Sequence, residues 1–219
     1  VVKGKGWIPK NGQFIFSANH PLGSLDGLAI ITVVATIHQS VKFVANDLLR
    51  VIKGLEPVFL YIARFGEIDR QNAREINKTL ASDAQLLVQP AGTVSKRNPV
   101  KISDLPWNKF FIRKAIQYKR DVIPVHVQAR NSRLFYNIAS FRKIFRIKSN
   151  LEMFLLPREM FNKSSKTISI TFGEPITYKT FDESRTHLEW AQKVREYVYL
   201  LGSENFSSAS TIPAFSEIL

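Results

Sequence analysis

A histidine and an aspartate lie close together near the start of the sequence. His20 and Asp26 are separated by five residues in the run NHPLGSLDG at positions 19–27. A histidine whose one ring nitrogen is held by a carboxylate keeps the other nitrogen free to accept a proton, which is the arrangement needed to deprotonate a hydroxyl group. Pro21 and Gly23 favour a turn tight enough to bring the two side chains together. The same residues also fit a simpler interpretation, in which Asp26 caps a helix and His20 is an ordinary turn residue.

Two further segments carry residues suited to binding an anion. In FGEIDR, at positions 65–70, Gly66 permits close approach of the backbone and Arg70 offers a two-pronged donor for a phosphate. An exposed ion pair with Asp69 would explain the same arginine. In QPAGTVSKR, at positions 89–97, a glycine turn, two hydroxyls and two cations follow an apolar run, so the loop can present N–H groups and positive charge to an oxyanion or phosphate. It also fits a plain basic surface loop.

The elements around these segments alternate between strand and helix. In an open α/β sheet, ligands bind beyond the carboxyl ends of the strands, so the candidate residues would gather at one edge. Pro124, within the buried run DVIPV at 121–125, predicts an edge or bulge position. The alternation predicts a single-domain α/β sandwich, with a mostly parallel central sheet flanked by helices. The expected strands are 13–19, 41–45, 84–89, 122–127 and 167–172, and the expected helices are 25–38, 71–82, 107–118, 132–145 and 183–201.

The order of these segments resembles the four motifs of the glycerolipid acyltransferase family, which contains the glycerol-3-phosphate and 1-acylglycerol-3-phosphate acyltransferases. The His–Asp pair, the Gly and Arg segment, the Pro-x-Gly-Thr loop and the Val-Ile-Pro-Val strand follow one another between positions 20 and 127. The run at 19–27, with RNSRLF at 130–135 and FLLPRE at 154–159, looks more closely like the hemolysin-like branch, which includes acyltransferases that make ornithine lipids and related aminoacyl lipids. The resemblance implies one acyltransferase domain over residues 1–202. We expect the tail at 203–219 to be loosely held.

The resemblance also implies roles for the matching residues. The catalytic pair would be His20 and Asp26, with no acyl-enzyme, metal or cofactor. Five residues separate this histidine from the aspartate where the main family has four. Ala91 stands where the family's third motif has glutamate, which favours a lyso-aminolipid over lysophosphatidate as acceptor. The residues implied to bind the acceptor are Gly66, Arg70, Pro90, Gly92, Thr93 and Ser95.

The expected activity is O-acyl transfer from acyl-CoA or acyl-carrier protein to the hydroxyl of a lyso-lipid. One alternative is a lipid esterase or thioesterase in the same pocket, although Ser24 lacks the Gly-x-Ser-x-Gly spacing of a nucleophile elbow. A second alternative is a non-enzymatic basic module that binds membranes or nucleic acid. The chain has no cysteine, which excludes disulfide frameworks, thiolate metal sites and cysteine nucleophiles. The other histidines lack metal-ligand spacing.

Positive charge is concentrated in one quarter of the chain. The net charge is +13, and residues 96–148 hold 14 basic residues against two acidic ones. Aromatic residues alternate with cations at 107–114 and 141–148, a pattern typical of a helix in an anionic membrane interface and also of a groove for single-stranded nucleic acid. A lipid substrate favours the membrane, and the longest apolar run, 27–37, is too short to span it, so we expect a peripheral protein at the cytoplasmic face. The cations assigned to this membrane surface are Lys109, Arg113, Lys114, Arg142, Lys143 and Arg146.

Overall fold

The computed structural model describes residues 1–46, 54–62, 70–98, 101–145, 151–161, 167–203 and 214–219. A seven-stranded sheet forms its centre, with the strand order β1-β9-β8-β2-β5-β3-β4. Every neighbouring pair is parallel except β8 and β9. The prediction of a mostly parallel sheet is therefore confirmed. The strands are β1 (Val2–Lys3), β2 (Phe14–Ala18), β3 (Val41–Asn46), β4 (Phe59–Ile62), β5 (Gln85–Val88), β8 (Asp121–Gln128) and β9 (Ser169–Phe172).

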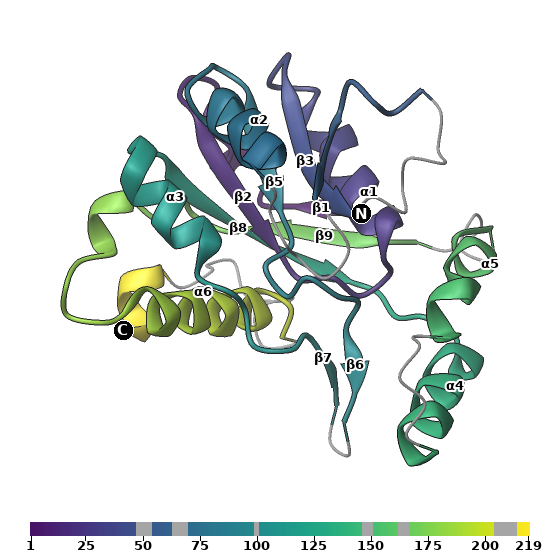
Figure 1. Ribbon diagram of the computed structural model, residues 1–219. Helices are drawn as coiled ribbons and strands as arrows, with labels where there is room; N and C mark the ends of the chain where they lie inside the picture. The colour runs from purple at the N-terminus through teal and green to yellow at the C-terminus, as the bar shows by residue number, and fades with distance from the viewer. Residues whose placement is uncertain (47–53, 63–69, 99–100, 146–150, 162–166, 204–213) are drawn as a thin grey trace.

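Helices cover both faces of this sheet (Figure 1). They are α1 (Ser24–Val34), α2 (Arg70–Leu80), α3 (Phe110–Tyr118), α4 (Arg133–Ile144), α5 (Leu156–Phe161) and α6 (His187–Leu201). Ile30 of α1 is buried with Phe16 of β2 on one face, whereas α2, α3 and α6 pack with Ile15 on the other. Successive side chains of β2 thus pack into two separate cores, one on each face of the sheet. In the ranges that the structure describes, no helix is long and apolar enough to cross a bilayer.

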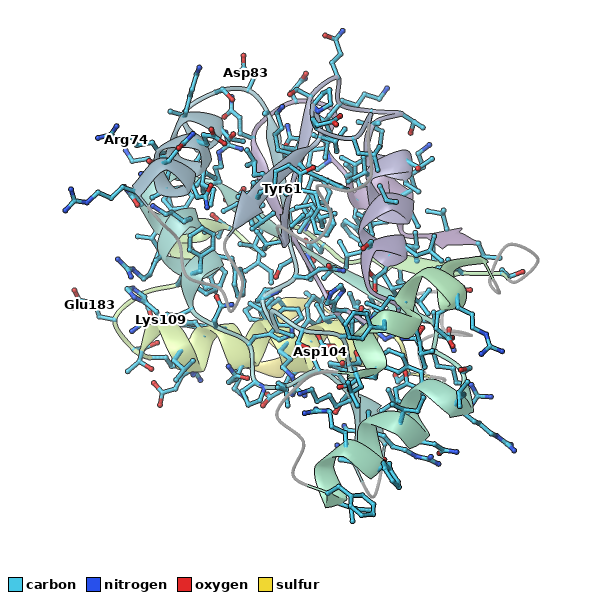
Figure 2. All side chains as sticks on the ribbon, turned by 45° about the vertical axis from the view of Figure 1, so that its right-hand side comes forward. Tyr61, Arg74, Asp83, Asp104, Lys109 and Glu183 are labelled. Atoms are coloured by element: carbon cyan, nitrogen blue, oxygen red, sulfur yellow. The ribbon has the colours of Figure 1, made fainter. Side chains whose placement is uncertain are left out.

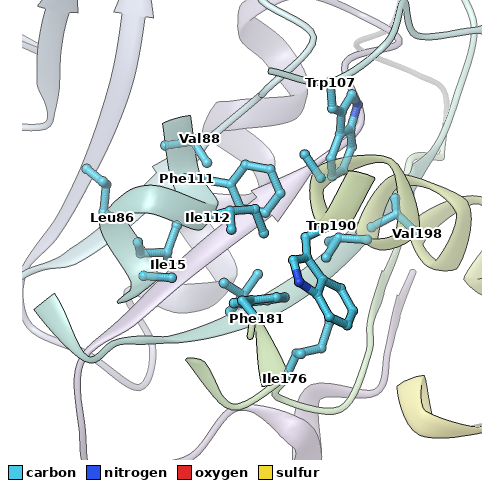
Figure 3. Packing of buried hydrophobic residues seen from close by; sticks show 14 of the residues in the cluster. Ile15, Leu86, Val88, Trp107, Phe111, Ile112, Ile176, Phe181, Trp190 and Val198 are labelled. Carbon is cyan, nitrogen blue, oxygen red and sulfur yellow. The ribbon is translucent and has the colours of Figure 1, made fainter. Parts of the chain in front are cut away.

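The core between the sheet and α6 contains two buried tryptophans, Trp107 and Trp190 (Figure 3). The buried residues of α6 fall at positions 190, 191, 194, 197, 198 and 201, which is the spacing of one helical face. This helix begins at His187 and not at the predicted residue 183, because Thr186 and Glu189 form a capping box. The Thr186 hydroxyl accepts a hydrogen bond from the Glu189 N–H, and the Glu189 carboxylate accepts one from the Thr186 N–H.

A buried arginine closes the carboxyl end of α2. Arg120 is only 2% exposed, and its Nε donates to the carbonyl of Leu80 at 3.1 Å. Its two terminal nitrogens donate to the carbonyls of Thr79, Ser82 and Ala84. Burial lowers the pKa of Arg120 to about 10. The guanidinium therefore donates to carbonyls at the end of α2 and in the turn that follows it, and it fixes the start of β5.

The structure contains strands that the sequence pattern did not predict. β1 and β4 span two and four residues, and a separate hairpin joins β6 (Lys96–Arg97) to β7 (Ile102–Ser103). Segments of two residues are too short to show a periodic pattern, and β4 closely follows Gly54 and Pro57, which mark a loop in the sequence. β4 extends the parallel sheet at one edge, and β1 closes the other edge by pairing with β9.

Pro124 lies in an internal strand, so the prediction of an edge position is wrong. β8 is flanked by β2 and β9, and Pro124 is level with Ser17 of β2. The carbonyl of Pro124 accepts a hydrogen bond from Gly173, just beyond the end of β9. The next bonds link Val122 with Ile176, so the opposite backbone leaves the regular ladder there. The missing N–H of proline falls at this irregularity, which agrees with the bulge alternative.

Three elements project together from the carboxyl edge of the sheet (Figure 1). We call α4, η4 (Leu151–Leu155) and α5 the arm; it lies beside the β6–β7 hairpin. Its base is held by the hydroxyl and N–H of Ser132, which donate to the carboxylate of Glu159 at 2.5 and 2.8 Å. A small apolar cluster joins the arm to the hairpin and comprises Val94, Phe135 and Tyr136, with Ile102, Leu155 and Leu156 packed against them.

The described end of the tail packs on the domain. Residues 204–213 lie outside the described ranges, and η6 (Phe215–Ile218) follows them. Phe215 is buried, with its ring 5.4 Å from the ring of Tyr197. For residues 214–219 the structure thus differs from the expected loosely held tail, because one aromatic side chain anchors them in the core.

Candidate active site

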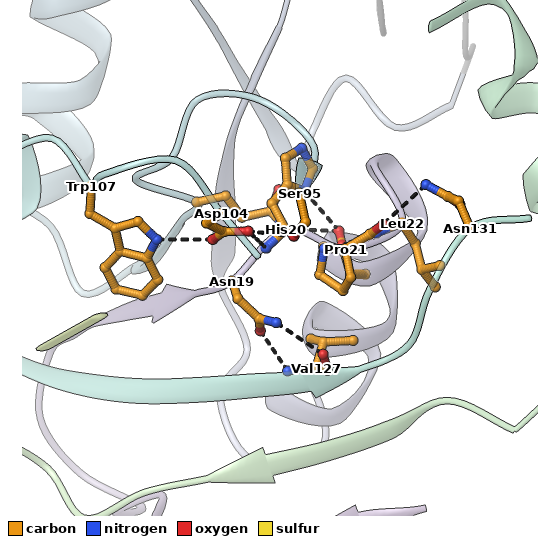
Figure 4. Close-up of polar contacts among 12 residues, drawn as sticks. Asn19, His20, Pro21, Leu22, Ser95, Asp104, Trp107, Val127 and Asn131 are labelled. Carbon is orange, nitrogen blue, oxygen red and sulfur yellow. Dashed lines mark hydrogen bonds and ion pairs between the residues drawn. The ribbon is translucent and has the colours of Figure 1, made fainter. Parts of the chain in front are cut away.

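The end of β2 is fixed by a side chain that continues the sheet. Asn19 follows the last residue of β2 and is 2% exposed. Its amide nitrogen donates to the carbonyl of Val127 at 3.0 Å, and its amide oxygen accepts from the Val127 N–H at 2.7 Å (Figure 4). These two bonds extend the pairing of β2 with β8 past the end of the strand. His20 is therefore presented at the carboxyl edge of the sheet, where an open α/β sheet binds its ligands.

The structure brings His20 and Asp26 together. The Nδ1 atom of His20 lies 3.2 Å from Oδ1 of Asp26, which is fully buried in the first turn of α1. Asp26 also accepts hydrogen bonds from the N–H of Leu22 at 2.9 Å and from the side-chain amide of Gln89 at 2.7 Å. Gly23 is the N-cap of α1, and no side chain caps it, so Asp26 is not the helix cap. The carboxylate instead fixes the imidazole.

The contact with Asp26 decides which ring nitrogen of His20 can act. Because the carboxylate accepts the Nδ1 proton, Nε2 carries the lone pair. Within the described residues no group hydrogen-bonds Nε2, and the side chain is 16% exposed. Burial lowers the pKa of His20, but the charge and hydrogen bond of Asp26, together with the charge of Asp104, outweigh it. The net effect raises the pKa above its usual value, so the ring is a stronger base than a free imidazole.

Asp104 supports His20 from the opposite side. Its Oδ1 accepts hydrogen bonds from the backbone N–H of His20 at 3.2 Å and from the Ser95 hydroxyl at 2.5 Å, and its Oδ2 accepts from the Trp107 indole at 2.9 Å (Figure 4). The Ser95 N–H in turn donates to the carbonyl of His20 at 2.7 Å. Asp104 thus links the candidate base to the loop after β5. In the sequence, Asp104 stands out only as one of two acidic residues in the basic segment at 96–148.

The loop at 89–97 is the segment predicted to bind the acceptor. Gly92 has φ +66°, in the left-handed region that favours glycine, and its N–H donates to the carbonyl of Gln89 at 3.0 Å. The carbonyl of Pro90 accepts from the Asn108 N–H at 3.0 Å. Thr93 is half-buried. The structure therefore places this loop beside His20, and it adds Gln89, which the sequence pattern does not assign to the site.

The turn from His20 into α1 is held from outside by residues near the arm. The side-chain amide of Asn131 donates to the carbonyl of Pro21 at 3.0 Å (Figure 4). Gly23 has φ +90°, and a Cβ there would lie 3.2 Å from both methyl groups of Leu156. Glycine is therefore required at this position by both its backbone angle and the close approach of α5.

The segment at 65–70, which carries Gly66 and Arg70, lies mostly outside the described residues. Gly66 lies outside the described residues. Arg70 is the first residue of α2 and is exposed. α2 comes after β4 in the chain, and β4 lies three strand positions from β2 in the same sheet. The structure does not bring Arg70 into contact with His20.

Other polar groups lie away from this edge. A surface pocket of about 590 Å³ lies between α3 and the start of α6, is lined by Lys109 and His187 among others, and does not include His20. His126 is buried beside Gly202, and burial lowers its pKa to about 4. Across the described ranges no three acidic, histidine or cysteine side chains gather as a metal site.

The cations assigned to one membrane surface occupy two separate places. Lys109 precedes α3 and Arg113 lies on it, on the other side of the molecule from α4 (Figures 1 and 2). Lys114 donates hydrogen bonds to Asn77 and Gln117. Arg142 of α4 pairs with Glu152 at 2.9 Å, so its charge is balanced. The side chain of Lys143 and the whole of Arg146 lie outside the described residues.

Comparisons with known proteins identify the family of this chain and support its fold. A family model described as acyltransferase matches residues 2–207. The chain is 43% identical over 201 residues to the lyso-glycine lipid O-acyltransferase of Bacteroides thetaiotaomicron, covering 91% of this chain and 74% of that protein. It is 39% identical to the enzyme of the same name from Phocaeicola vulgatus, covering 91% and 72%.

A solved structure supports the fold. The crystal structure of PlsC, the 1-acyl-sn-glycerophosphate acyltransferase of Thermotoga maritima, superposes with a TM-score of 0.58 at 19% identity, covering 96% of this chain and 73% of that one. At this identity the likeness concerns the fold alone. The family model, however, covers almost the whole chain. Together with the two relatives, it shows that this chain belongs to the acyltransferase family.

Proposed function

We propose that the protein is an O-acyltransferase that moves a fatty acyl chain from a thioester of CoA or acyl-carrier protein to the hydroxyl of a lyso-lipid. The observation that carries the proposal is the His20–Asp26 pair at the carboxyl edge of the sheet, with Nδ1 held and Nε2 left to accept a proton. The names of the two relatives point to a lyso-lipid acceptor.

The proposed reaction is a direct transfer. His20 Nε2 accepts the hydroxyl proton while the hydroxyl oxygen attacks the thioester carbonyl carbon, and the carbonyl oxygen becomes an oxyanion. The intermediate collapses by breaking the carbon–sulfur bond, and the imidazolium returns the proton to the leaving thiolate. The products are the ester and the free thiol. Asp26 stabilises the imidazolium throughout, as a buried carboxylate does in related dyads.

The oxyanion needs hydrogen-bond donors near His20. Gly92 already donates its N–H to the carbonyl of Gln89. Gly23 opens α1, and its N–H makes no hydrogen bond within the described residues. We therefore assign oxyanion stabilisation to the N–H groups at the start of α1, where the helix dipole adds positive potential. No side-chain nucleophile is needed, and Ser24 makes no hydrogen bond to the His20 ring in the part of the chain that the structure describes.

For the acceptor we propose a lyso-lipid that carries an amino acid, as in glycine lipids. The relatives' names support this choice, and Ala91 removes the glutamate that the glycerol phosphate enzymes share in this loop. Thioester donors of this kind occur in the cytoplasm, so we place the enzyme at the cytoplasmic face of the cell membrane. We assign no metal or cofactor to the reaction.

The test is a donor and acceptor matrix with purified protein. Each thioester is incubated with lyso-glycine lipid, lyso-ornithine lipid or lysophosphatidate, and the acylated product is identified by mass spectrometry. Because the chain has no cysteine, thiol release can be followed with a thiol reagent without background from the protein. We expect product with a lyso-aminolipid and none with His20→Ala. Thiol release without acylated product would instead indicate a thioesterase, and full activity of His20→Ala would refute the dyad.

A further inference from the structure

The outer end of the arm exposes an unusual amount of apolar surface. Phe154 of η4 is 79% exposed and Ile144 of α4 is 75% exposed. Phe141 and Phe145 are also mostly exposed, with ring centroids 4.2 Å apart. On α4, positions 134, 138 and 141 form one helical stripe, which Phe145 continues just after the helix ends, so the apolar face of this end points outward while Phe135 and Tyr136 fill the base. A soluble domain normally turns such a stripe inward.

The exposed charges of the arm, in its described residues, and of the neighbouring hairpin are all positive. Arg133 and Arg158 are exposed on the arm, and Arg130 is exposed just before it. The two carboxylates of the arm in its described residues, Glu152 and Glu159, are both buried and bonded. The neighbouring hairpin adds two exposed cations, Arg97 and Lys101. An apolar end with arginine and lysine behind it, at the base of the arm and on the hairpin, complements an anionic lipid surface, where the headgroups meet the cations and the acyl region receives the apolar side chains.

The arm is also attached directly to the candidate active site. Leu156 lies against Gly23 in the turn after His20, and it is two residues from the exposed Phe154. The apolar cluster at the base, with Phe135 and Leu155, joins the exposed end to this contact. A lipid that leaves the bilayer beside Phe154 would therefore meet apolar side chains on its way to the catalytic edge of the sheet.

We propose that the outer end of the arm inserts into an anionic membrane and sets the catalytic edge of the sheet against the lipid surface. Membrane insertion by the arm rests on the proposed function, because a lyso-lipid acceptor lies in a membrane. Binding to vesicles nevertheless tests it without any substrate. α3 takes no part, because it lies on the other side of the molecule (Figure 1).

Insertion is tested with tryptophan reporters on otherwise unchanged protein. Phe154→Trp places a fluorophore at the arm, and Leu188→Trp places one at an accessible apolar position at the start of α6. Each protein is mixed with vesicles of phosphatidylglycerol and phosphatidylcholine whose acyl chains carry bromine, which quenches tryptophan on contact. We expect quenching for Phe154→Trp and none beyond the parent for Leu188→Trp. Equal quenching of the two, or none at position 154, would overturn the proposal.

Binding measurements with variants distinguish the apolar from the electrostatic contribution to vesicle binding. Sedimentation with the same lipids lacking bromine should show binding about 100-fold weaker for the triple variant Phe141→Ser, Ile144→Ser and Phe154→Ser. Arg133→Glu should weaken binding on the order of 10-fold, whereas Arg113→Glu on α3 should stay within about twofold of the parent. Circular dichroism confirms that each variant is folded. Equal binding of parent and triple variant, or a stronger effect of Arg113→Glu, would refute this assignment.

Two further measurements distinguish membrane insertion from self-association and from catalysis. Light scattering that shows a dimer without lipid, and a monomer for the triple variant, would identify a second copy of the chain as the occupant of the apolar end and overturn the membrane assignment. His20→Ala is expected to bind vesicles as the parent does. If it does so while acyl transfer is absent from the parent as well, the proposed function fails and the arm assignment stands.

Discussion

The replacement of Asp26 by asparagine examines the general base most directly. The variant keeps the shape of the side chain but removes the charge that lies 3.2 Å from Nδ1 of His20. The imidazolium formed during proton transfer then loses its partner, and the tautomer is no longer fixed. We expect kcat/KM to fall about 100- to 10,000-fold, which corresponds to about 3–5 kcal/mol in the barrier.

The pH dependence of Asp26→Asn gives a second readout. Burial lowers the pKa of His20, and the contributions of Asp26 and Asp104 together raise it above its usual value. Without the charge of Asp26, burial prevails and the pKa moves down. A general base must be unprotonated to act, so the acid limb of kcat/KM should shift to lower pH even though its plateau falls.

Stability must be measured beside activity for this variant. Asp26 accepts from Leu22, Gly27 and Gln89 as well as from His20. If the new amide group faces the N–H of Leu22, one buried donor is left unsatisfied, at a cost of about 1–3 kcal/mol. Thiol release is therefore assayed where circular dichroism shows a folded protein. Activity within about threefold of the parent, or an acid limb that moves to higher pH, would refute the reasoning.

Three further predictions follow from neighbouring contacts. Gln89→Leu removes the 2.7 Å bond to Asp26, so we expect kcat to fall about tenfold with KM unchanged, and a KM effect alone would exclude a positioning role. The pKa of His20 is raised in the folded protein, so protonated His20 stabilises the fold. The difference in unfolding free energy between parent and His20→Ala should therefore be present below pH 6.5 and decline as pH rises through the folded pKa. Urea titrations in which this difference grows with pH would contradict the assignment. Arg120→Met leaves the carbonyls of the buried residues Leu80 and Ala84 without their guanidinium donor and should destabilise the fold by about 3–5 kcal/mol in urea, whereas a loss below about 1 kcal/mol would show that water replaces the guanidinium.

The sequence predicted those parts of the fold that depend on the local pattern of apolar and polar residues. The alternation of apolar strands and helices led to the α/β sandwich, and the His20 and Asp26 pairing followed from a short turn with proline and glycine. β4 was missed because it closely follows Gly54 and Pro57, which mark a loop in the sequence, and the start of α6 was predicted too early because the capping box at Thr186 was not recognised.

Contacts between distant segments could not be obtained in this way. Gln89 is 63 residues from Asp26, and Asp104 is 84 residues from His20, so nothing local connects them. The same limit explains the basic surface. Aromatic and cationic residues on α3 and α4 follow the same local pattern, but only the packing of the helices shows that they lie on different sides of the molecule.

The close spacing of Phe154 and Leu156 bears on which acceptors the enzyme can reach. Phe154 lies in η4, and Leu156, which lies against Gly23, begins α5 only two residues later. With the arm seated among headgroups, the acceptor need not be extracted into water. A hydroxyl close to the polar layer then has a short path to the catalytic edge, which selects lipids by the depth of their reactive oxygen in the bilayer.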